Sequence, residues 1–295
     1  MKYAFFPGCV SKGGCPELYQ SVMQVYPRLG IELEEMTTAS CTGAGVLQEK
    51  DPRLGDLLNA HTLALAEQQG LPIMTICSTC QGVMSQANHR LKSNPSYLAE
   101  INQVLEKEGI TYRGTTTVKH FVWILLEDIG EDTILQHVKQ SLTGLRAAPF
   151  YGCYLQRPSD ALGFDEIPSR AKSLETVIDL LGAEVVDFPG KTRCCGLPLL
   201  TINEPNSLKM VAHHTSDAKE HGADLMVTPC PLCHLNLDGL QSKAGTQNGM
   251  KIGLPILHLP QLLGLAMGMK PKTLGMNRNL VSTQSVMEKI GVGTT

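Results

Sequence analysis

The sequence predicts an α/β protein with two duplicated domains, each a small parallel sheet covered by helices, with metal sites at the carboxyl ends of the strands. Three observations predict this fold: a cysteine pattern that occurs twice, short apolar runs before the cysteines, and amphipathic helical patterns between these runs. Alternating strands and helices are typical of parallel sheets, whose ligand loops leave the carboxyl ends of the strands. We expect a first domain over residues 1–145, a second over 146–270 and a C-terminal tail over 271–295.

The cysteines carry the clearest sign of duplication. The first half contains Cys9, the triplet Cys41-Thr42-Gly43 and the motif Cys77-Ser78-Thr79-Cys80. The second half contains Cys153, Cys194-Cys195-Gly196 and Cys230-Pro231-Leu232-Cys233. Cys194, Cys230 and Cys233 each follow their first-half counterparts by 153 positions. We therefore expect each half to be one folding unit that holds its own metal site.

The expected elements place these cysteines at strand ends. Short apolar runs predict buried strands over residues 3–6, 73–76, 149–151 and 225–228. Apolar residues three and four positions apart predict amphipathic helices over residues 18–29 and 174–181. Each strand run lies just before a cysteine, so the thiols should meet at one edge of each sheet.

Composition excludes several other classes of protein. A chain of 295 residues with 42% hydrophobic residues is long enough for two cores, and its net charge of −3 gives no reason to expect nucleic-acid binding. Residues 1–4 lead into the first predicted strand without a signal-peptide pattern, and no apolar stretch has the roughly 20 residues that a membrane span needs. We expect a cytoplasmic protein whose ten cysteines serve metal or redox chemistry rather than disulfides.

The doubled motif resembles that of the CCG-domain family, which includes the B-subunit of heterodisulfide reductase and a similar subunit of archaeal- and cyanobacterial-type succinate dehydrogenases. The resemblance covers nearly the whole chain and implies a Rossmann-like fold for each domain. It also implies that the complete motif holds a noncubane [4Fe-4S] cluster with five thiolates. The residues that match this set are Cys153, Cys194, Cys195, Cys230 and Cys233.

The first half departs from the family pattern because Thr42 replaces the second cysteine of the triplet. The four thiols that remain are Cys9, Cys41, Cys77 and Cys80. Such a set suits either an iron-sulfur cluster with four cysteine ligands or a structural zinc ion, and the sequence leaves both open. Thr42 is expected to be a capping hydroxyl, with a weak oxygen ligand as the alternative.

Cys15 is the one cysteine outside the two motifs. It precedes Pro16 at an expected helix start, where the positive end of the helix should lower the thiol pKa. It is either a fifth ligand of the first site or a small buried residue.

Several histidines and one Met-containing segment have two interpretations each. His120, His234 and His258 lie near the motifs and either supply protons or have structural roles. We expect His213, His214 and His221 to be solvated. Residues 262–269 predict a core helix that closes the second domain, with a membrane or partner surface as the alternative.

These features predict an iron-sulfur electron-transfer subunit of an oxidoreductase complex, similar to the B-subunit of heterodisulfide reductase, with a disulfide or a quinone as the acceptor. The alternative is a non-catalytic relay or assembly subunit of a succinate dehydrogenase or hydroxy-acid oxidase complex. The chain has no glycine fingerprint for a dinucleotide and no P-loop. We therefore expect it to need a flavoprotein, a ferredoxin-type iron-sulfur subunit or both, and to contact a membrane or quinone only peripherally.

Overall fold

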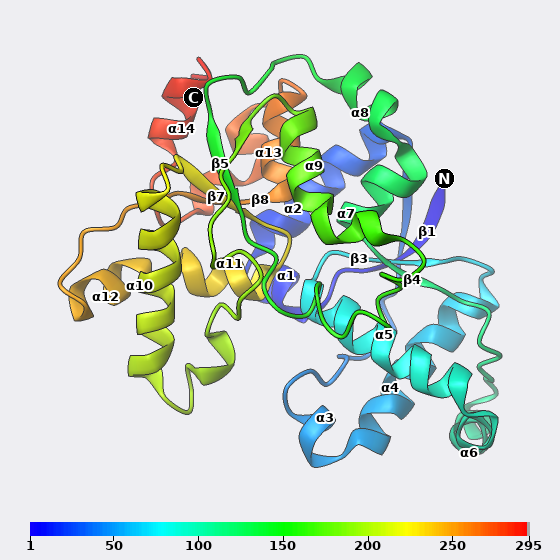
Figure 1. Cartoon of the computed structure of the whole chain (residues 1–295). Helices are drawn as coiled ribbons and strands as arrows, with labels where there is room; N and C mark the ends of the chain where they lie inside the picture. Colours follow the sequence, from blue (N-terminus) through cyan, green and yellow to red (C-terminus); the bar gives the residue numbers. More distant parts are fainter. Residues whose placement is uncertain (294–295) are drawn as a thin grey trace.

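The computed structural model describes residues 1–293 and contains two four-stranded parallel sheets with helices around them (Figure 1). The first sheet has the order β2-β1-β3-β4, with β1 (Lys2–Phe6), β2 (Glu32–Glu35), β3 (Ile73–Thr75) and β4 (Val118–His120). The second has the order β6-β5-β7-β8, with β5 (Arg146–Pro149), β6 (Glu184–Val185), β7 (Leu225–Thr228) and β8 (Ile256–His258). The same order in both halves confirms the predicted duplicated α/β fold.

Strand β5 differs from its expected position. It covers Arg146–Pro149 rather than 149–151, and its Ala147 pairs with Val185 of β6 on one side and with Leu225 of β7 on the other. Two small alanines do not form a recognisable apolar run, so the sequence pattern placed this strand too late. The chain leaves the sheet by way of Gly152, whose φ of 72° favours glycine.

Helices of the first half connect its strands and cover its sheet. They are α1 (Cys9–Gly13), α2 (Pro16–Val25), α3 (Leu47–Lys50), α4 (Pro52–Gln68), α5 (Ser78–Ser93), α6 (Pro95–Leu105), α7 (Phe121–Ile124) and α8 (Glu131–His137). Side-chain caps fix two of the starts. The Asp51 carboxylate accepts a hydrogen bond from the Leu54 amide at 3.0 Å, and the Asn94 side chain accepts one from the Tyr97 amide at 3.1 Å.

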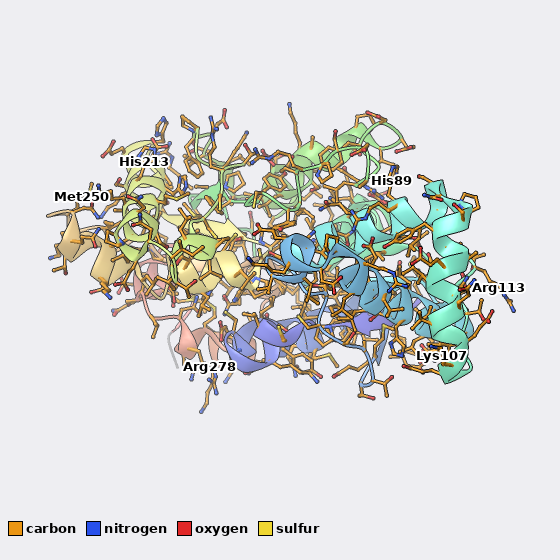
Figure 2. The ribbon with its side chains drawn as sticks, turned by 90° about the horizontal axis from the view of Figure 1, so that it is seen from below. His89, Lys107, Arg113, His213, Met250 and Arg278 are labelled. Carbon is orange, nitrogen blue, oxygen red and sulfur yellow. The ribbon has the colours of Figure 1, made fainter. Side chains whose placement is uncertain are left out.

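The second half repeats this arrangement with shorter connections at its end. Its helices are α9 (Ser173–Leu180), α10 (Glu204–Glu220), α11 (Pro231–Leu237), α12 (Gln241–Gln247), α13 (Leu259–Ala266) and α14 (Gln284–Lys289). Seen from below, Lys107 and Arg113 near α6 lie at one end of the molecule, and His213 of α10 and Met250 lie at the other (Figure 2). All residues of α13 are buried, which agrees with the expected core helix.

The two halves share their apolar core. Helix α2 of the first half packs on α13 of the second (Figure 1), and one continuous cluster joins Phe5, Trp123 and Tyr151. A second cluster joins Phe6 of β1 to Phe150 after β5. This packing corrects the expectation that each half is an independent folding unit, because burial of these side chains requires both halves.

The tail after residue 270 is docked on both halves, against α2 of the first and α13 of the second. Leu274, Val286 and Met287 are buried, although the sequence suggested few apolar anchors there. The Asp238 carboxylate accepts hydrogen bonds from the Leu280 amide at 2.6 Å and the Val281 amide at 3.1 Å. Residues 294–295 lie outside the described part of the chain.

None of the helices formed by residues 1–293 is both long enough and apolar enough to cross a bilayer.

Candidate metal centre

The thiols of the second half lie in three loops at the carboxyl ends of its strands. Cys153 follows β5, Cys194 and Cys195 follow β6, and Cys230 is the N-cap residue of α11 directly after β7. The Thr228 hydroxyl at the end of β7 accepts a hydrogen bond from the Cys230 amide at 3.3 Å. The sheet thus places these thiols at one edge, as predicted.

The five sulfur atoms of this half form a continuous series of contacts. The Cys194 thiol lies within hydrogen-bonding reach of both Cys153 and Cys195. Cys195 in turn reaches Cys233, which reaches Cys230. Hydrogen bonds from Cys153 and Cys195 lower the pKa of the Cys194 thiol to about 2. The same contacts raise the pKa of the Cys153 and Cys233 thiols, so the series shares protons that a bound metal would displace.

Glycines bring the backbone close to the thiols. At Gly152 (φ 72°) a Cβ atom would lie only 2.8 Å from the Cys233 sulfur. At the equivalent Gly8 (φ 75°) a Cβ atom would lie 3.3 Å from the Cys80 sulfur. Both positions therefore favour glycine, because a Cβ atom would crowd the neighbouring sulfur and because the φ angle is positive.

The two triplets present their first cysteine in the same way. The Gly196 amide donates to the Cys194 sulfur at 3.4 Å, and the Gly43 amide donates to the Cys41 sulfur at 3.5 Å. Backbone N–H groups that point at cluster sulfurs are one of the means by which proteins set redox potential. The two triplets are therefore alike in geometry as well as in sequence.

An asparagine side chain donates a hydrogen bond to the backbone carbonyl of the second residue of each triplet. The Asn236 amide donates to the Cys195 carbonyl at 2.7 Å, and the Asn59 amide donates to the Thr42 carbonyl at 3.0 Å. Thr42 is buried and its hydroxyl faces the Cys80 sulfur at 3.9 Å. The threonine thus takes the place in the first site that Cys195 has in the second.

His214 is a site residue that the sequence interpretation missed. Its Nε2 donates to the Cys194 carbonyl at 2.9 Å, and burial lowers the pKa of its imidazole. The expectation that this histidine is solvated is wrong, whereas its neighbour His213 points away from the molecule (Figure 2). The helical spacing could have indicated that His214 is buried, because position 214 lies three residues after the buried Val211 and four before the buried Ala218.

The thiols of the first half occupy the matching loops. Cys9 begins α1 after β1, Cys41 follows β2, and Cys77 is the N-cap residue of α5 after β3. The Cys9 thiol lies within hydrogen-bonding reach of Cys41 and close to Cys80. The Cys77 thiol also lies within hydrogen-bonding reach of Cys80.

This first site is open to solvent. Cys9 and Cys41 are exposed, and both line a cavity of about 240 Å³. An ion pair between Lys12 and Glu35 lies on the wall of the same cavity. The counterparts of Cys9 and Cys41 in the second half, Cys153 and Cys194, are half-buried, whereas the CxxC thiols are buried in both halves.

The two sites adjoin each other at the boundary between the halves. The Cys77 thiol lies within hydrogen-bonding reach of Cys230, and the Thr79 hydroxyl lies 3.8 Å from the Cys230 sulfur. The Ser78 hydroxyl donates to the Pro229 carbonyl at 3.4 Å. The expected metal sites are therefore contiguous rather than separated by a domain interface.

His120 and Cys15 differ in part from their expected roles. His120 is fully buried near Cys230, and burial lowers its imidazole pKa to about 3, so the ring is neutral. Cys15 is also buried, and burial followed by the nearby Glu17 carboxylate raises its thiol pKa. The expected lowering by the helix terminus is wrong because loss of solvation outweighs it.

The spacing of the motif thiols suits a group larger than one ion. A tetrahedral zinc ion with Zn–S bonds of about 2.3 Å places its sulfurs only about 3.8 Å apart. Among residues 1–293, the single group of three or more Cys, His, Asp or Glu ligand atoms that all lie within 4.8 Å of one another is Cys15, Glu17, His234 and His258. No three of the nine motif sulfurs in the described chain all lie within that distance of one another, although neighbouring thiols are in contact.

The fold and the thiols together define a class of protein: a duplicated α/β chain with a cysteine-rich site at the edge of each parallel sheet. Comparison with family profiles matches residues 3–85 and 147–238 to the CCG family, described as "Cysteine-rich domain". The chain belongs to this family, which confirms the resemblance drawn from the sequence.

Four relatives at 30% identity or more have names from two kinds of reductase. The chain is 39% identical over 280 residues to the 8-methylmenaquinol:fumarate reductase membrane anchor subunit of Wolinella succinogenes, covering 95% of this chain and 97% of that one. It is 32% identical over 276 residues to a heterodisulfide reductase B-subunit-like protein of Archaeoglobus profundus, covering 92% of each. These relatives are similar over nearly their whole length.

A crystal structure of a hypothetical protein from Helicobacter pylori has the same fold. Its TM-score is 0.76 at 18% identity over 95% of this chain. This chain spans about half of that protein, 52% of its length. At this identity the likeness shows the fold alone.

Proposed function

We propose that this chain is an electron-transfer subunit of an oxidoreductase complex, with a noncubane [4Fe-4S] cluster in its second half and a second iron-sulfur cluster in its first. The ligands of the noncubane cluster would be Cys153, Cys194, Cys195, Cys230 and Cys233. Those of the first-half cluster would be Cys9, Cys41, Cys77 and Cys80. The observation that carries the proposal is the pair of adjoining thiol sets at equivalent sheet edges.

The donor sets fit such clusters. All nine groups are thiols, glycines stand where the backbone approaches them, and amides of Gly43 and Gly196 point at sulfur. When bound, iron-sulfur clusters supply one-electron redox chemistry at a potential set by hydrogen bonds and burial. The wide sulfur spacing favours a cluster over zinc in the first half.

The protein surroundings of the two sites suggest a direction of approach for partners. The exposed Cys9 and Cys41 open on a cavity, whereas their counterparts Cys153 and Cys194 are half-buried. We place the electron donor, a flavoprotein or a ferredoxin-type subunit, at the open first site. The contact of Cys77 with Cys230 leaves no intervening protein between the sites, which suits rapid exchange of electrons.

A quinone is the proposed electron acceptor, at the end of the electron path opposite the donor. This choice follows the relative with 39% identity, whose name includes a menaquinol and a fumarate reductase. We place the protein on the cytoplasmic side of a membrane, attached peripherally. Disulfide reduction is the second candidate, favoured by the heterodisulfide-reductase-like relative at 32% identity. A relay or assembly role without direct contact to quinone is the remaining alternative.

The test is to purify the complex anaerobically through a tag on this chain, reduce it, and mix it with either a soluble menaquinone analogue or an organic disulfide. We expect the quinone analogue to reoxidise the complex and a flavoprotein to co-purify with it. Reoxidation by the disulfide alone would replace the proposed acceptor with the second candidate. Failure of both, with partners present, would support the relay role.

A further inference from the structure

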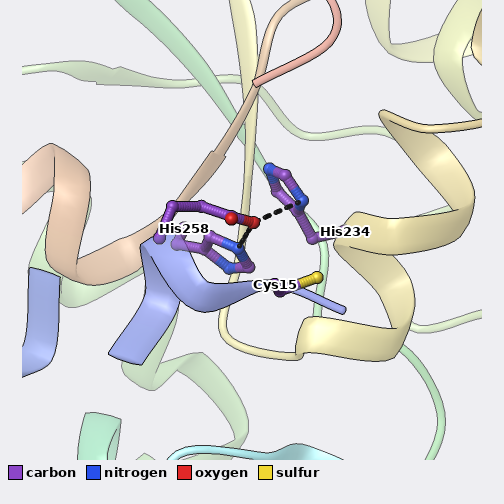
Figure 3. A group of neighbouring side chains, drawn as sticks. Cys15, His234 and His258 are labelled. Carbon is purple, nitrogen blue, oxygen red and sulfur yellow. Dashed lines mark hydrogen bonds and ion pairs between the residues drawn. The ribbon is translucent and has the colours of Figure 1, made fainter. Parts of the chain in front are cut away.

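A second group of metal-ligating side chains lies outside the nine motif cysteines. It consists of Cys15, Glu17, His234 and His258, all of them buried (Figure 3). One ligand atom from each residue lies within 4.8 Å of the other three. Cys15 and Glu17 come from the start of α2 in the first half, and the histidines come from α11 and the end of β8 in the second.

The distances within this group resemble the edges of a ligand tetrahedron. Glu17 Oε1 lies 3.2 Å from His258 Nε2 and 3.8 Å from His234 Nδ1 (Figure 3). Four N or O ligands about 2.1 Å from one ion lie about 3.4 Å from each other. The rings of His234 and His258 are stacked with their centroids 3.8 Å apart, which places their nitrogens side by side, and the rings would tilt toward each other to share one ion.

One tautomer of His234 has the lone pair that a metal needs. In it, Nε2 donates to the Ile256 carbonyl at 3.1 Å and Nδ1 keeps its lone pair, while the Asn279 amide, 3.3 Å from Nε2, donates to the same carbonyl at 2.7 Å. That lone pair faces the Glu17 carboxylate, so two acceptors meet with no proton between them. A histidine that donates its second ring N–H to a backbone carbonyl is the common outer-shell arrangement at metal sites.

The negative charge of Glu17 in this group also has no lysine or arginine beside it among the described residues. Burial opposes ionisation of Glu17, but its contacts with His258 and Cys15 lower its pKa overall, so the carboxylate is charged. The Glu17 carboxylate accepts a hydrogen bond from His258 Nε2 at 3.2 Å. A buried carboxylate held by neutral donors is costly, and a divalent ion in place of the shared proton would balance its charge.

A path for the ion is present. A cavity of about 160 Å³ is lined by Cys15, Glu17 and His234, with the exposed Arg278 on its wall. The site therefore has the donors, the spacing, an outer shell and an entrance.

We propose that Cys15, Glu17, His234 and His258 bind one tetrahedral divalent transition-metal ion, with zinc as the best match to a mixed sulfur, nitrogen and oxygen donor set. The Cys15 thiol gives up its proton when the ion binds. Because each half contributes two ligands, the ion joins α2 to α11 and β8 and holds the halves together. This proposal does not depend on the redox role of the nine motif thiols.

The test uses the purified full chain and measures zinc and iron together after exhaustive dialysis. The variants are His258→Gln and Cys15→Ser, and the matched control is Cys41→Ser in the first motif site. We expect zinc in the wild type, a loss of zinc affinity of at least about 100-fold in both variants with iron retained, and unchanged zinc in the control. Zinc that is absent from the wild type, kept in both variants, or lost in Cys41→Ser would overturn the proposal.

Cobalt substitution gives a second readout that a mere folding defect would not imitate. With Co²⁺ in place of zinc, the thiolate-to-cobalt absorption band should vanish in Cys15→Ser while weaker cobalt absorption persists from the remaining ligands. A band that survives in Cys15→Ser and vanishes in Cys41→Ser would place the ion in the first motif site instead. Circular dichroism of each variant checks that the fold is intact.

Discussion

Cys77 and Cys230 lie within hydrogen-bonding reach of each other, although they are equivalent residues of the two halves and stand 153 positions apart. Each is the N-cap residue of the helix that follows the third strand of its half, α5 and α11. The duplication thus brings the same position of both motifs to one point. The two sites should consequently influence each other electrostatically.

The first prediction concerns this contact. Cys77→Ser removes a thiol of the first site that lies beside Cys230, so the midpoint potential of the second-half site should shift because the charge next to one of its thiols changes. Redox titration followed by EPR measures the shift. Cys41→Ser, which changes the far side of the first site, is the control and should leave that potential nearly unchanged. Equal shifts in both variants would argue against direct coupling through Cys77.

The second prediction concerns Thr42. Its buried hydroxyl faces the Cys80 sulfur at 3.9 Å, in the place that corresponds to Cys195. Thr42→Cys should therefore supply the missing fifth thiol, and the first site should acquire the EPR signal of the second. Thr42→Ser keeps a hydroxyl and should leave the spectrum as it is. An unchanged spectrum in Thr42→Cys would mean that more than this residue prevents a second noncubane cluster.

The third prediction concerns an ion pair that joins the halves. The Arg170 guanidinium donates two hydrogen bonds to Glu127, at 2.7 and 2.9 Å, and lies 4.5 Å from the centre of the Trp123 ring. Arg170→Ala leaves the largely buried Glu127 carboxylate with Lys119, 3.1 Å away, as its partner, and the loss of two charged hydrogen bonds should lower the free energy of unfolding by about 2 kcal/mol. Chemical denaturation measures this loss.

The control for this pair is the exposed contact of Arg53 with Glu100. Arg53→Ala should cost less than about 1 kcal/mol, because solvent screens an exposed pair. Similar losses in the two variants would contradict the structural role assigned to Arg170.

The fourth prediction is a pH dependence at Glu67. Burial opposes its ionisation, but hydrogen bonds from the Thr115 hydroxyl and from the Thr115 and Arg113 amides lower the carboxyl pKa overall. A lowered pKa in the folded state stabilises the fold above the unfolded pKa of 4.5, and this stability is lost as the pH falls through the folded pKa. Glu67→Gln should therefore cost about 1 kcal/mol at pH 7.

The same comparison at acid pH checks the sign. Below the folded pKa both proteins carry a neutral side chain, so the difference between wild type and Glu67→Gln should become small. A difference that stays constant with pH would show that the carboxylate charge contributes nothing.

The sequence predicted the fold class and the positions of the motif thiols because these follow from local patterns. Cys153 and Cys230 come directly after apolar runs, and parallel strands bring such positions to one edge of a sheet. The constant offset between Cys77 and Cys230 revealed the duplication, although their contact depends on how the sheets pack. No periodicity specifies which faces of two sheets meet.

Other features depended on tertiary packing in the same way. Glu17 is a charged residue on a helix pattern and gave no sign of burial between two histidines from the other half. The sequence left open whether the tail docks or is mobile, because its anchors, Leu274 and Met287, are isolated among polar residues. Burial of such residues is decided by the partner surface and not by their own neighbours in sequence.

The most direct test of the proposed function is low-temperature EPR of the anaerobically purified protein, with iron and sulfide content, in the wild type and in Cys195→Ser. The wild type should contain about eight irons per chain, and oxidation should give an unusual signal from the second-half site. Cys195→Ser should lose that signal and about four irons while the first-half cluster remains. A signal that survives in Cys195→Ser, or a wild type without iron, would contradict the assignment of the noncubane cluster to the second half.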